Sequence, residues 1–180
     1  MTPAAFPMPL PDPPLRSGSL TLRPWREADA PVLAAAWGDV DIARWTGVPE
    51  RRDVAAAARW IAGGEARRER GVAIDLVLDA DGSAVGEVGL AEIDCRAGRA
   101  EIGWWVHASH RGRGWAGVAA RLLATWTVEE LCLDTVVARC ATDNPASGRV
   151  AAAAGFTLGA VTDGMEVWTF DPARAAMVDA

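Results

Sequence analysis

The residues best suited to chemistry lie in one short segment that reads His110-Arg111-Gly112-Arg113-Gly114-Trp115-Ala116. Glycines allow a backbone to approach a ligand closely, and the free amides at the start of a helix attract phosphate. The side chains of Arg111 and Arg113 would add charge-assisted donors. The segment therefore predicts a cradle for a pyrophosphate group, with a turn carrying two solvated arginines as the alternative. It lacks the lysine and the spacing of a Walker A loop, which argues against nucleotide hydrolysis.

The segment lies between a predicted strand and a predicted helix. The strand covers residues 100–106, and the helix runs from about residue 116 to residue 128 with its apolar side chains on one face. Apolar periodicity and turn residues predict the other elements. These are strands at 19–25, 72–78, 84–93, 135–141, 156–161 and 165–170, and helices at 28–38, 53–70 and 145–155, with an irregular segment at 39–50.

The order of these elements predicts the fold class. A strand, two helices, three antiparallel strands, a helix, a strand, a helix and two strands make an α+β fold with mixed layers. This order differs from the regular alternation of a dinucleotide-binding sheet. The 180 residues fit one domain, which we place at residues 17–172. Six prolines near the start predict an extended arm over residues 1–16, and residues 173–180 would form a tail.

Composition narrows the classes of partner and of compartment. The net charge is -6 and the chain has no lysine, which disfavours nucleic-acid binding and suits a cationic substrate such as an amine. No stretch reaches the about eighteen continuous apolar residues of a membrane span, and the N-terminus lacks the features of a signal peptide. The three cysteines, Cys95, Cys132 and Cys140, show no metal-ligand spacing. We therefore expect free thiols, no metal, no membrane contact and a cytoplasmic location.

Four segments together resemble the GNAT superfamily of acetyltransferases. The spacing Arg111-x-x-Gly114-x-Ala116, after a strand and before a helix, is similar to the coenzyme A signature of that superfamily. The other three are similar to its ribosomal-protein N-acetyltransferase, or Rim-type, branch: Leu20-Thr21-Leu22-Arg23-Pro24-Trp25-x-x-x-Asp29-Ala30, Ala100-Glu101-Ile102-Gly103-Trp104, and Asn144-x-x-Ser147-x-x-Val150 followed by Gly155-Phe156. The likeness covers about residues 19–170, nearly the whole chain.

The resemblance implies a fold and a cosubstrate. The fold is a twisted, mostly antiparallel sheet of about seven strands, flanked by about four helices and splayed at its centre. The cosubstrate is acetyl-CoA, and no metal takes part. The coenzyme-binding residues that the resemblance implies are the backbone of Trp105 and Val106 for the pantetheine arm, the loop amides of Arg111, Gly112, Arg113, Gly114, Trp115 and Ala116 for the pyrophosphate, and the side chains of Asn144 and Ser147.

Acetyl transfer to an amine requires a base, donors for the oxyanion and a proton or equivalent stabilisation for the leaving thiolate. Glu101 is the first candidate for the base, directly or through a water, and a strand carboxylate paired with an arginine is the alternative. His107 is the other candidate, because the period of two places it on the same face of that strand. By resemblance, the Val106 N–H is the candidate donor to the thioester oxygen.

Many members of the superfamily protonate the thiolate with a tyrosine seven residues after the asparagine. That position holds Ala151, and the chain contains no tyrosine, so this route is excluded. The hydroxyl of Ser147 is the substitute that the Rim-type resemblance implies, with or without a bridging water. Asn144 before Pro145 also predicts a helix N-cap.

The acceptor side would be the predicted two-helix region that follows the first strand, which usually covers the acceptor in this superfamily. Trp37, Trp45 and Trp60 lie there and would form an aromatic wall for an apolar or cationic acceptor, with core packing as the alternative. The predicted substrate-binding residues are Trp37, Trp45, Glu101 and His107.

The leading interpretation is an acetyl-CoA-dependent N-acetyltransferase that acts by direct transfer in a ternary complex. Its acceptor would be the primary amine of a peptide N-terminus, an amino acid or another small molecule. The alternative is a non-catalytic acyl-CoA-binding regulatory module. The protein would be a monomer or a homodimer, with no nucleic-acid partner.

Overall fold

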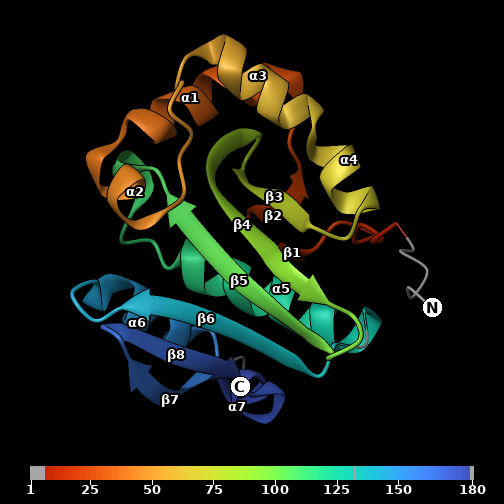
Figure 1. The fold of residues 1–180 in the computed structure, drawn as a ribbon, viewed down its shortest axis with the longest axis vertical. Helices are drawn as coiled ribbons and strands as arrows, with labels where there is room; N and C mark the ends of the chain where they lie inside the picture. Colours follow the sequence, from red (N-terminus) through yellow and green to blue (C-terminus); the bar gives the residue numbers. More distant parts are fainter. Residues whose placement is uncertain (1–6, 132, 179–180) are drawn as a thin grey trace.

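The computed structural model describes residues 7–131 and 133–178. At its centre is an eight-stranded sheet with the order β1-β2-β3-β4-β5-β6-β8-β7 (Figure 1). The strands are β1 (Arg16–Ser17), β2 (Leu20–Pro24), β3 (Ala73–Ala80), β4 (Ser83–Asp94), β5 (Arg99–Val106), β6 (Thr135–Ala141), β7 (Phe156–Thr162) and β8 (Met165–Phe170). Neighbouring strands run antiparallel except for β5 and β6, which are parallel.

Seven α-helical segments and two short 3-10 turns flank the sheet in the described part of the chain. They are η1 (Glu27–Asp29), α1 (Ala30–Gly38), α2 (Val40–Trp45), α3 (Val54–Ala62), α4 (Gly64–Glu69), η2 (Ala108–His110), α5 (Trp115–Glu130), α6 (Pro145–Ala153) and α7 (Pro172–Val178). Helices α1 to α4 arch over one side of the sheet (Figure 1). Helix α5 packs on β4 and β5, and α6 packs on β6 and β7.

Apolar side chains on the two faces of the sheet form two separate cores, as the strand period of two requires. Along β5, Ala100 and Ile102 belong to the core that includes Leu123 of α5. Trp105 belongs instead to the core under the α1–α3 layer, with Leu33 of α1. The strand that ends at the glycine segment is therefore held from both faces.

A buried arginine network fixes the first strands. The Arg23 guanidinium on β2 pairs with the carboxylates of Asp29 in η1 and Asp79 on β3. All three side chains are buried. Removing one member of such a group leaves an uncompensated buried charge, so the network holds β2, β3 and the start of α1 together.

The sheet opens between β5 and β6. The two strands pair only where residues 99–101 lie beside residues 135–137. Beyond that point β5 continues beside β4, while β6 continues beside β8. The two strands therefore diverge toward α2 and α6 (Figure 1), in agreement with the predicted splay.

The predicted fold class is confirmed, and β6 and β8 have the predicted bounds. The sheet has eight strands rather than about seven, because the short β1 adds to its edge. The described helices also exceed the predicted number of about four. One reason is that the predicted helix at 53–70 is divided at Gly63, next to Gly64, and glycine is a poor helix former.

The prediction of an irregular segment at 39–50 is wrong, because that segment contains α2. Asp39 caps the helix, since its side chain accepts from the amides of Asp41 and Ile42. An aspartate before six residues is a weak signal in sequence, and the helix is short. Its position matters for the site described below.

The two ends of the described chain pack on the domain. The Met8 side chain is buried, and its N–H donates to the Arg68 carbonyl at 3.3 Å. The Leu15 carbonyl accepts from the Leu22 N–H at 2.8 Å. At the other end α7 occupies most of the segment that was predicted to be a tail.

Candidate active site

A cavity of about 490 Å³ lies where β5 and β6 diverge. Four parts of the chain line it: α2, the end of β5, the glycine segment with the start of α5, and α6 with its N-cap. The lining residues are Asp41, Ile42, Trp45, Thr46, residues 104–106, residues 110–117, Asn144, Ala146, Ser147, Arg149, Val150 and Ala153. A cavity of this size suits a small ligand or the arm of a larger one.

The glycine segment forms one wall with its amides at the start of α5. Gly112 and Gly114 have φ angles of +79° and +77°, a conformation that side-chain-bearing residues rarely adopt. Gly114 also occupies the N-cap of α5 and brings no side chain to cap it. The 16-residue helix therefore presents free amides and its positive dipole end to the cavity. This is the geometry that the pyrophosphate prediction requires.

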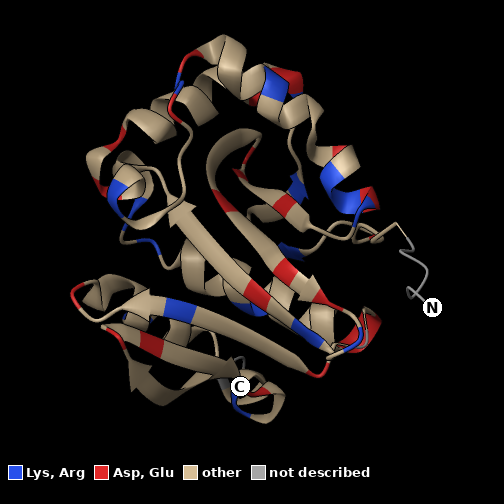
Figure 2. Cartoon of the chain, viewed as in Figure 1, with Lys and Arg blue, Asp and Glu red and all other residues tan. Residues whose placement is uncertain are grey.

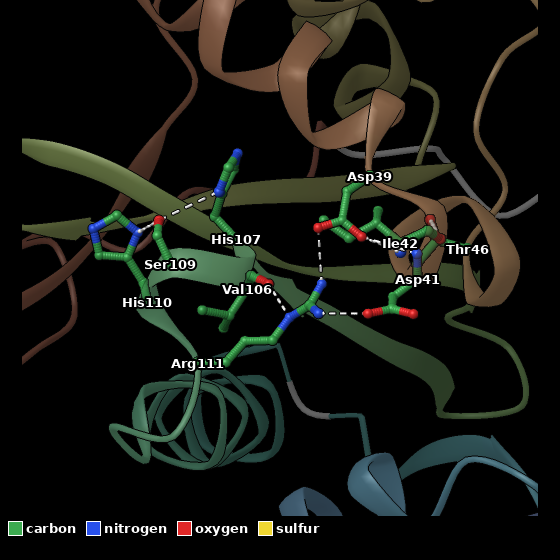
Figure 3. A network of polar contacts seen from close by, with 9 residues as sticks. All are labelled: Asp39, Asp41, Ile42, Thr46, Val106, His107, Ser109, His110 and Arg111. Atoms are coloured by element: carbon green, nitrogen blue, oxygen red, sulfur yellow. Dashed lines mark hydrogen bonds and ion pairs between the residues drawn. The ribbon is translucent and has the colours of Figure 1, made fainter.

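The Arg111 side chain was predicted to bind phosphate, but in the structure it contacts other parts of the protein. Its Nε donates to the Val106 carbonyl at 3.0 Å (Figure 3). Its two Nη atoms pair with Asp41 at 2.7 Å and Asp39 at 3.1 Å. The sequence did not predict the two carboxylate partners, because they belong to α2 and its N-cap, which were not predicted. The Arg113 guanidinium lies over the Trp115 ring, 5.1 Å from its centroid.

The end of β5 presents a backbone edge to the cavity. The His107 N–H donates to the Val85 carbonyl of β4 at 2.9 Å. Because amides alternate along a strand, the preceding Val106 N–H points away from β4, toward the opening. Trp105 is also among the lining residues, while it packs in the core on the α1–α3 face.

Glu101 lies at the point where the pairing of β5 and β6 ends, opposite Val137. The Glu101 Oε2 atom is 3.4 Å from Arg139 Nε. This oxygen is buried and has no hydrogen-bond partner in the described part of the structure. Burial raises the pKa of this carboxyl, while Arg139 opposes the rise and Glu92 adds to it. Glu101 lies outside the set of residues that line the cavity. The paired-carboxylate alternative therefore applies in part, with Arg139 as the partner.

A second carboxyl, which sequence reasoning missed, lies on the same face of the sheet. Glu87 on β4 accepts from the indole N–H of Trp25 at 2.7 Å and of Trp105 at 3.2 Å. Burial, and then the charge of Asp75, raise the pKa of Glu87 to about 7. Figure 2 shows acidic positions on each of β3, β4 and β5. The signal in the sequence was a carboxylate in the middle of a mostly apolar strand.

The start of α6 forms another wall of the cavity. The Asn144 side chain accepts from the Ser147 N–H at 3.3 Å, and Pro145 follows at the first helical position. The predicted N-cap is therefore confirmed. Asn144 and Ser147 both line the cavity, whereas Ala151, at the position of the missing tyrosine, is fully buried.

The remaining predicted residues separate into two groups. Trp45 lines the cavity, with the Arg44 guanidinium 4.4 Å from its ring centroid. Trp37 differs from the prediction, because it is only 5 % exposed and packs edge-on against Trp60 in the second core. Helical spacing cannot distinguish a core tryptophan from one that lines a cavity. His107 follows β5 beside the cavity and is not among its lining residues.

Within residues 7–131 and 133–178, no group of three or more His, Cys, Asp or Glu side chains could hold a metal ion. In the same residues, no helix is both long enough and apolar enough to cross a membrane. Cys95 and Cys140 are free thiols; Cys140 is buried, whereas Cys95 is exposed, which differs from the expectation of buried or partly buried thiols. Cys132 lies outside the described residues.

Comparisons with known proteins agree with this architecture. The acetyltransferase (GNAT) domain model matches residues 19–157. An uncharacterized N-acetyltransferase, p20, from Bacillus licheniformis is 28% identical over 135 residues, which cover 71% of this chain and 73% of that protein. The ribosomal-protein-serine acetyltransferase of Escherichia coli (strain K12) is 31% identical over 90 residues, 50% of each chain.

Among solved structures, Mycobacterium smegmatis RimJ in complex with CoA-disulfide superposes with a TM-score of 0.77 and 22% sequence identity. The match covers 92% of this chain and 90% of that one, and it shows the shared fold. The Rim-type resemblance and the expectation of an acetyl-CoA-dependent N-acetyltransferase are confirmed at the level of the family. With a splayed sheet, an uncapped helix start beside the cavity and a domain match over most of its length, the chain belongs to the GNAT acetyltransferase family.

Proposed function

We propose that this protein transfers the acetyl group of acetyl-CoA directly to a primary amine within a ternary complex. The observation that carries the proposal is the cavity at the sheet splay, which joins the free edge of β5 to the amide-rich start of α5. Acetyl-CoA supplies the acetyl group as an activated thioester. The chain's own residues bind, orient and exchange protons around it.

The coenzyme would be held mainly by backbone. The amides of residues 111–116 would bind the pyrophosphate, supported by the left-handed glycines and the uncapped start of α5. The edge of β5 at Trp105 and Val106 would pair with the pantetheine amides. Asn144 and Ser147, at the start of α6, would contact the arm as it enters the cavity.

Val106 would donate its N–H to the thioester oxygen as negative charge develops there. The alternation of amides along β5 supports this assignment, because the neighbouring His107 N–H is used by Val85. A fixed amide costs no reorganisation at the moment of reaction, and losing one such donor typically costs about 100- to 1,000-fold in rate.

Glu101 would accept the ammonium proton of the acceptor, through a bridging water. The raised pKa of its carboxyl supports this role, because a base poised nearer neutrality transfers protons more effectively. Glu101 lies where the pairing of β5 and β6 ends, and it is outside the cavity lining. A water rather than direct contact would therefore connect it to the amine. Arg139 would hold the carboxylate in position.

Ser147 would stabilise the departing thiolate with its hydroxyl. Its place in the cavity wall supports this assignment. Ala151 rules out a tyrosine at the usual position. The demand on Ser147 is modest, because the pKa of a free thiol is only about 8.5.

The acceptor would be a peptide N-terminus or an amino-acid-like amine. The support is the name of the E. coli relative, a ribosomal-protein-serine acetyltransferase, together with the net charge of -6. Trp45 would line the approach of this amine. We also propose a cytoplasmic location, supported by the free thiols of Cys95 and Cys140.

The test is a thiol-release assay with acetyl-CoA and a panel of amines: short peptides with different N-termini, amino acids, polyamines and aminoglycosides. Glu101→Gln should lower kcat by about 100-fold or more while acetyl-CoA still binds in calorimetry. Ser147→Ala should cost about tenfold or less. Glu69→Gln, on the exposed end of α4, is the matched control. Full activity in Glu101→Gln would refute the base assignment.

A further inference from the structure

A single guanidinium connects three parts of the candidate site. Arg111 follows β5, and its side chain reaches the last carbonyl of that strand and two carboxylates of α2 (Figure 3). Its partners Asp39 and Asp41 precede it by about seventy residues in the chain. Arginine suits this arrangement, because its planar fork carries separate donors in fixed directions, whereas a lysine ammonium does not.

Asp39 divides its two oxygens between two tasks. Oδ1 accepts from the amides of Asp41 and Ile42, which caps α2, while Oδ2 pairs with Arg111. Burial acts to raise the pKa of Asp39, but the two amides and the Arg111 charge outweigh it and leave the pKa lowered. The Asp39 side chain is only 14 % exposed, so this pair is shielded from solvent on one side.

Helix α2 lines the cavity and is held at both ends. Its first turn pairs with Arg111, and Arg44 in its last turn pairs at 3.0 Å with Asp143, just before α6. The Arg44–Asp143 pair is exposed and contributes little. The helix contributes Asp41, Ile42, Trp45 and Thr46 to the cavity wall, so its position shapes the space that an acceptor would enter.

We propose that Arg111 is a positioning residue that fixes α2 against the end of β5, so that the acceptor-side wall of the cavity forms, and that its guanidinium is not a phosphate ligand. To reach a phosphate, the guanidinium would have to leave three partners and deprive the shielded Asp39 of its cation. Arg113 is exposed at the same loop and pairs with no carboxylate within residues 7–131 and 133–178, so it is the arginine suited to phosphate. The inference rests on the proposed function where it concerns the acceptor.

The test compares three variants that weaken the connection in different ways. Asp39→Asn removes the charge and keeps the N-cap, because asparagine caps as well as aspartate. Asp41→Asn removes the second carboxylate, and Arg111→Lys keeps the charge without the fork. Asp53→Asn is the matched control, since Asp53 caps α3 in the same way, by accepting from the Ala56 amide.

The first readout is hydrogen exchange of the α2 amides, which needs no turnover. The three variants should speed exchange at residues 40–45 by about three- to tenfold, with α3 unchanged, and Asp53→Asn should leave α2 unchanged. The second is kinetic: the acceptor KM should rise by about three- to tenfold, while the Kd for acetyl-CoA changes less than about twofold. Arg113→Gln should instead weaken acetyl-CoA binding.

Two results would overturn the proposal. One is α2 exchange in all three variants that matches wild type. The other is acetyl-CoA binding that weakens about tenfold in Arg111→Lys and tightens in Asp39→Asn, as expected for a phosphate ligand released from its carboxylates. If no amine on the panel is acetylated by wild type, the proposed function fails, while the exchange and binding readouts still decide the role of Arg111.

Discussion

Replacing Glu87 by glutamine should remove a loss of folding stability that the wild-type protein undergoes as the pH rises from about 4.5 to about 7. Burial is the main reason that the pKa of Glu87 is raised from 4.5 to about 7, with the charge of Asp75 adding to it. The indole N–H groups of Trp25 and Trp105 and the charge of Arg67 act in the opposite direction. A raised pKa means that the folded state disfavours the ionised carboxyl.

The sign and the size of the effect follow from linkage. Below the unfolded pKa both states hold the proton, so Glu87 imposes no pH-dependent cost on folding. As the pH rises from about 4.5 to about 7, the unfolded chain releases the proton more readily, and stability is lost. The difference between 4.5 and about 7 corresponds to about 3 kcal/mol, which is an upper figure because the Glu87 side chain is only partly buried.

The assay is urea unfolding of wild type and Glu87→Gln at several values between about pH 4.5 and pH 8.5. The free energy of unfolding of wild type, minus that of the variant, should fall by about 2–3 kcal/mol across this window. Titrating groups that do not interact with Glu87 cancel in the difference, and the titration of Asp75 forms part of the measured effect because its charge acts on Glu87. Glutamine has one acceptor oxygen where glutamate has two, so one of the two indole N–H groups loses its acceptor. This loss adds a pH-independent offset to the difference in the free energy of unfolding. Glu69→Gln should give a flat difference, and a flat difference for Glu87→Gln, within about 0.5 kcal/mol, would refute the reasoning.

Two further substitutions test the packing around the site. Gly86→Ala would place a Cβ 2.4 Å from the Trp105 carbonyl oxygen, so the free energy of unfolding should fall by about 2–3 kcal/mol. At Gly103 nothing lies within 4 Å of an added Cβ, so Gly103→Ala should change the free energy of unfolding by less than about 0.5 kcal/mol. Arg23→Met would leave two buried carboxylates without a cation and should cost about 3–5 kcal/mol in urea unfolding. Equal losses in the two glycine variants, or a loss below about 1 kcal/mol for Arg23→Met, would contradict these accounts.

Local signals predicted the elements that carry the coenzyme site. The glycines at 112 and 114 indicated a turn before a helix, and Asn144 followed by Pro145 indicated a capped helix start; the structure has both. These features depend on the conformation of a few consecutive residues. The sequence could therefore indicate them without knowledge of tertiary contacts.

The missed features depend on residues distant in the chain. Helix α2 has only six residues, and Arg111 holds its first turn from about seventy residues away. Glu87 became notable only when β5 brought Trp105 beside it. Glu101 was placed on the right strand, but its distance from the cavity depends on where β5 and β6 diverge. No local pattern encodes that point.

In the proposed reaction, acetyl-CoA and an amine occupy this cavity together and react directly. The most direct test is an initial-rate study that varies acetyl-CoA and an accepted amine over a grid of concentrations, with thiol release as the readout. Direct transfer predicts double-reciprocal lines that intersect, and no thiol release in the absence of the amine. Parallel lines, with a burst of thiol from acetyl-CoA alone, would show a covalent acetyl-enzyme and would contradict the account.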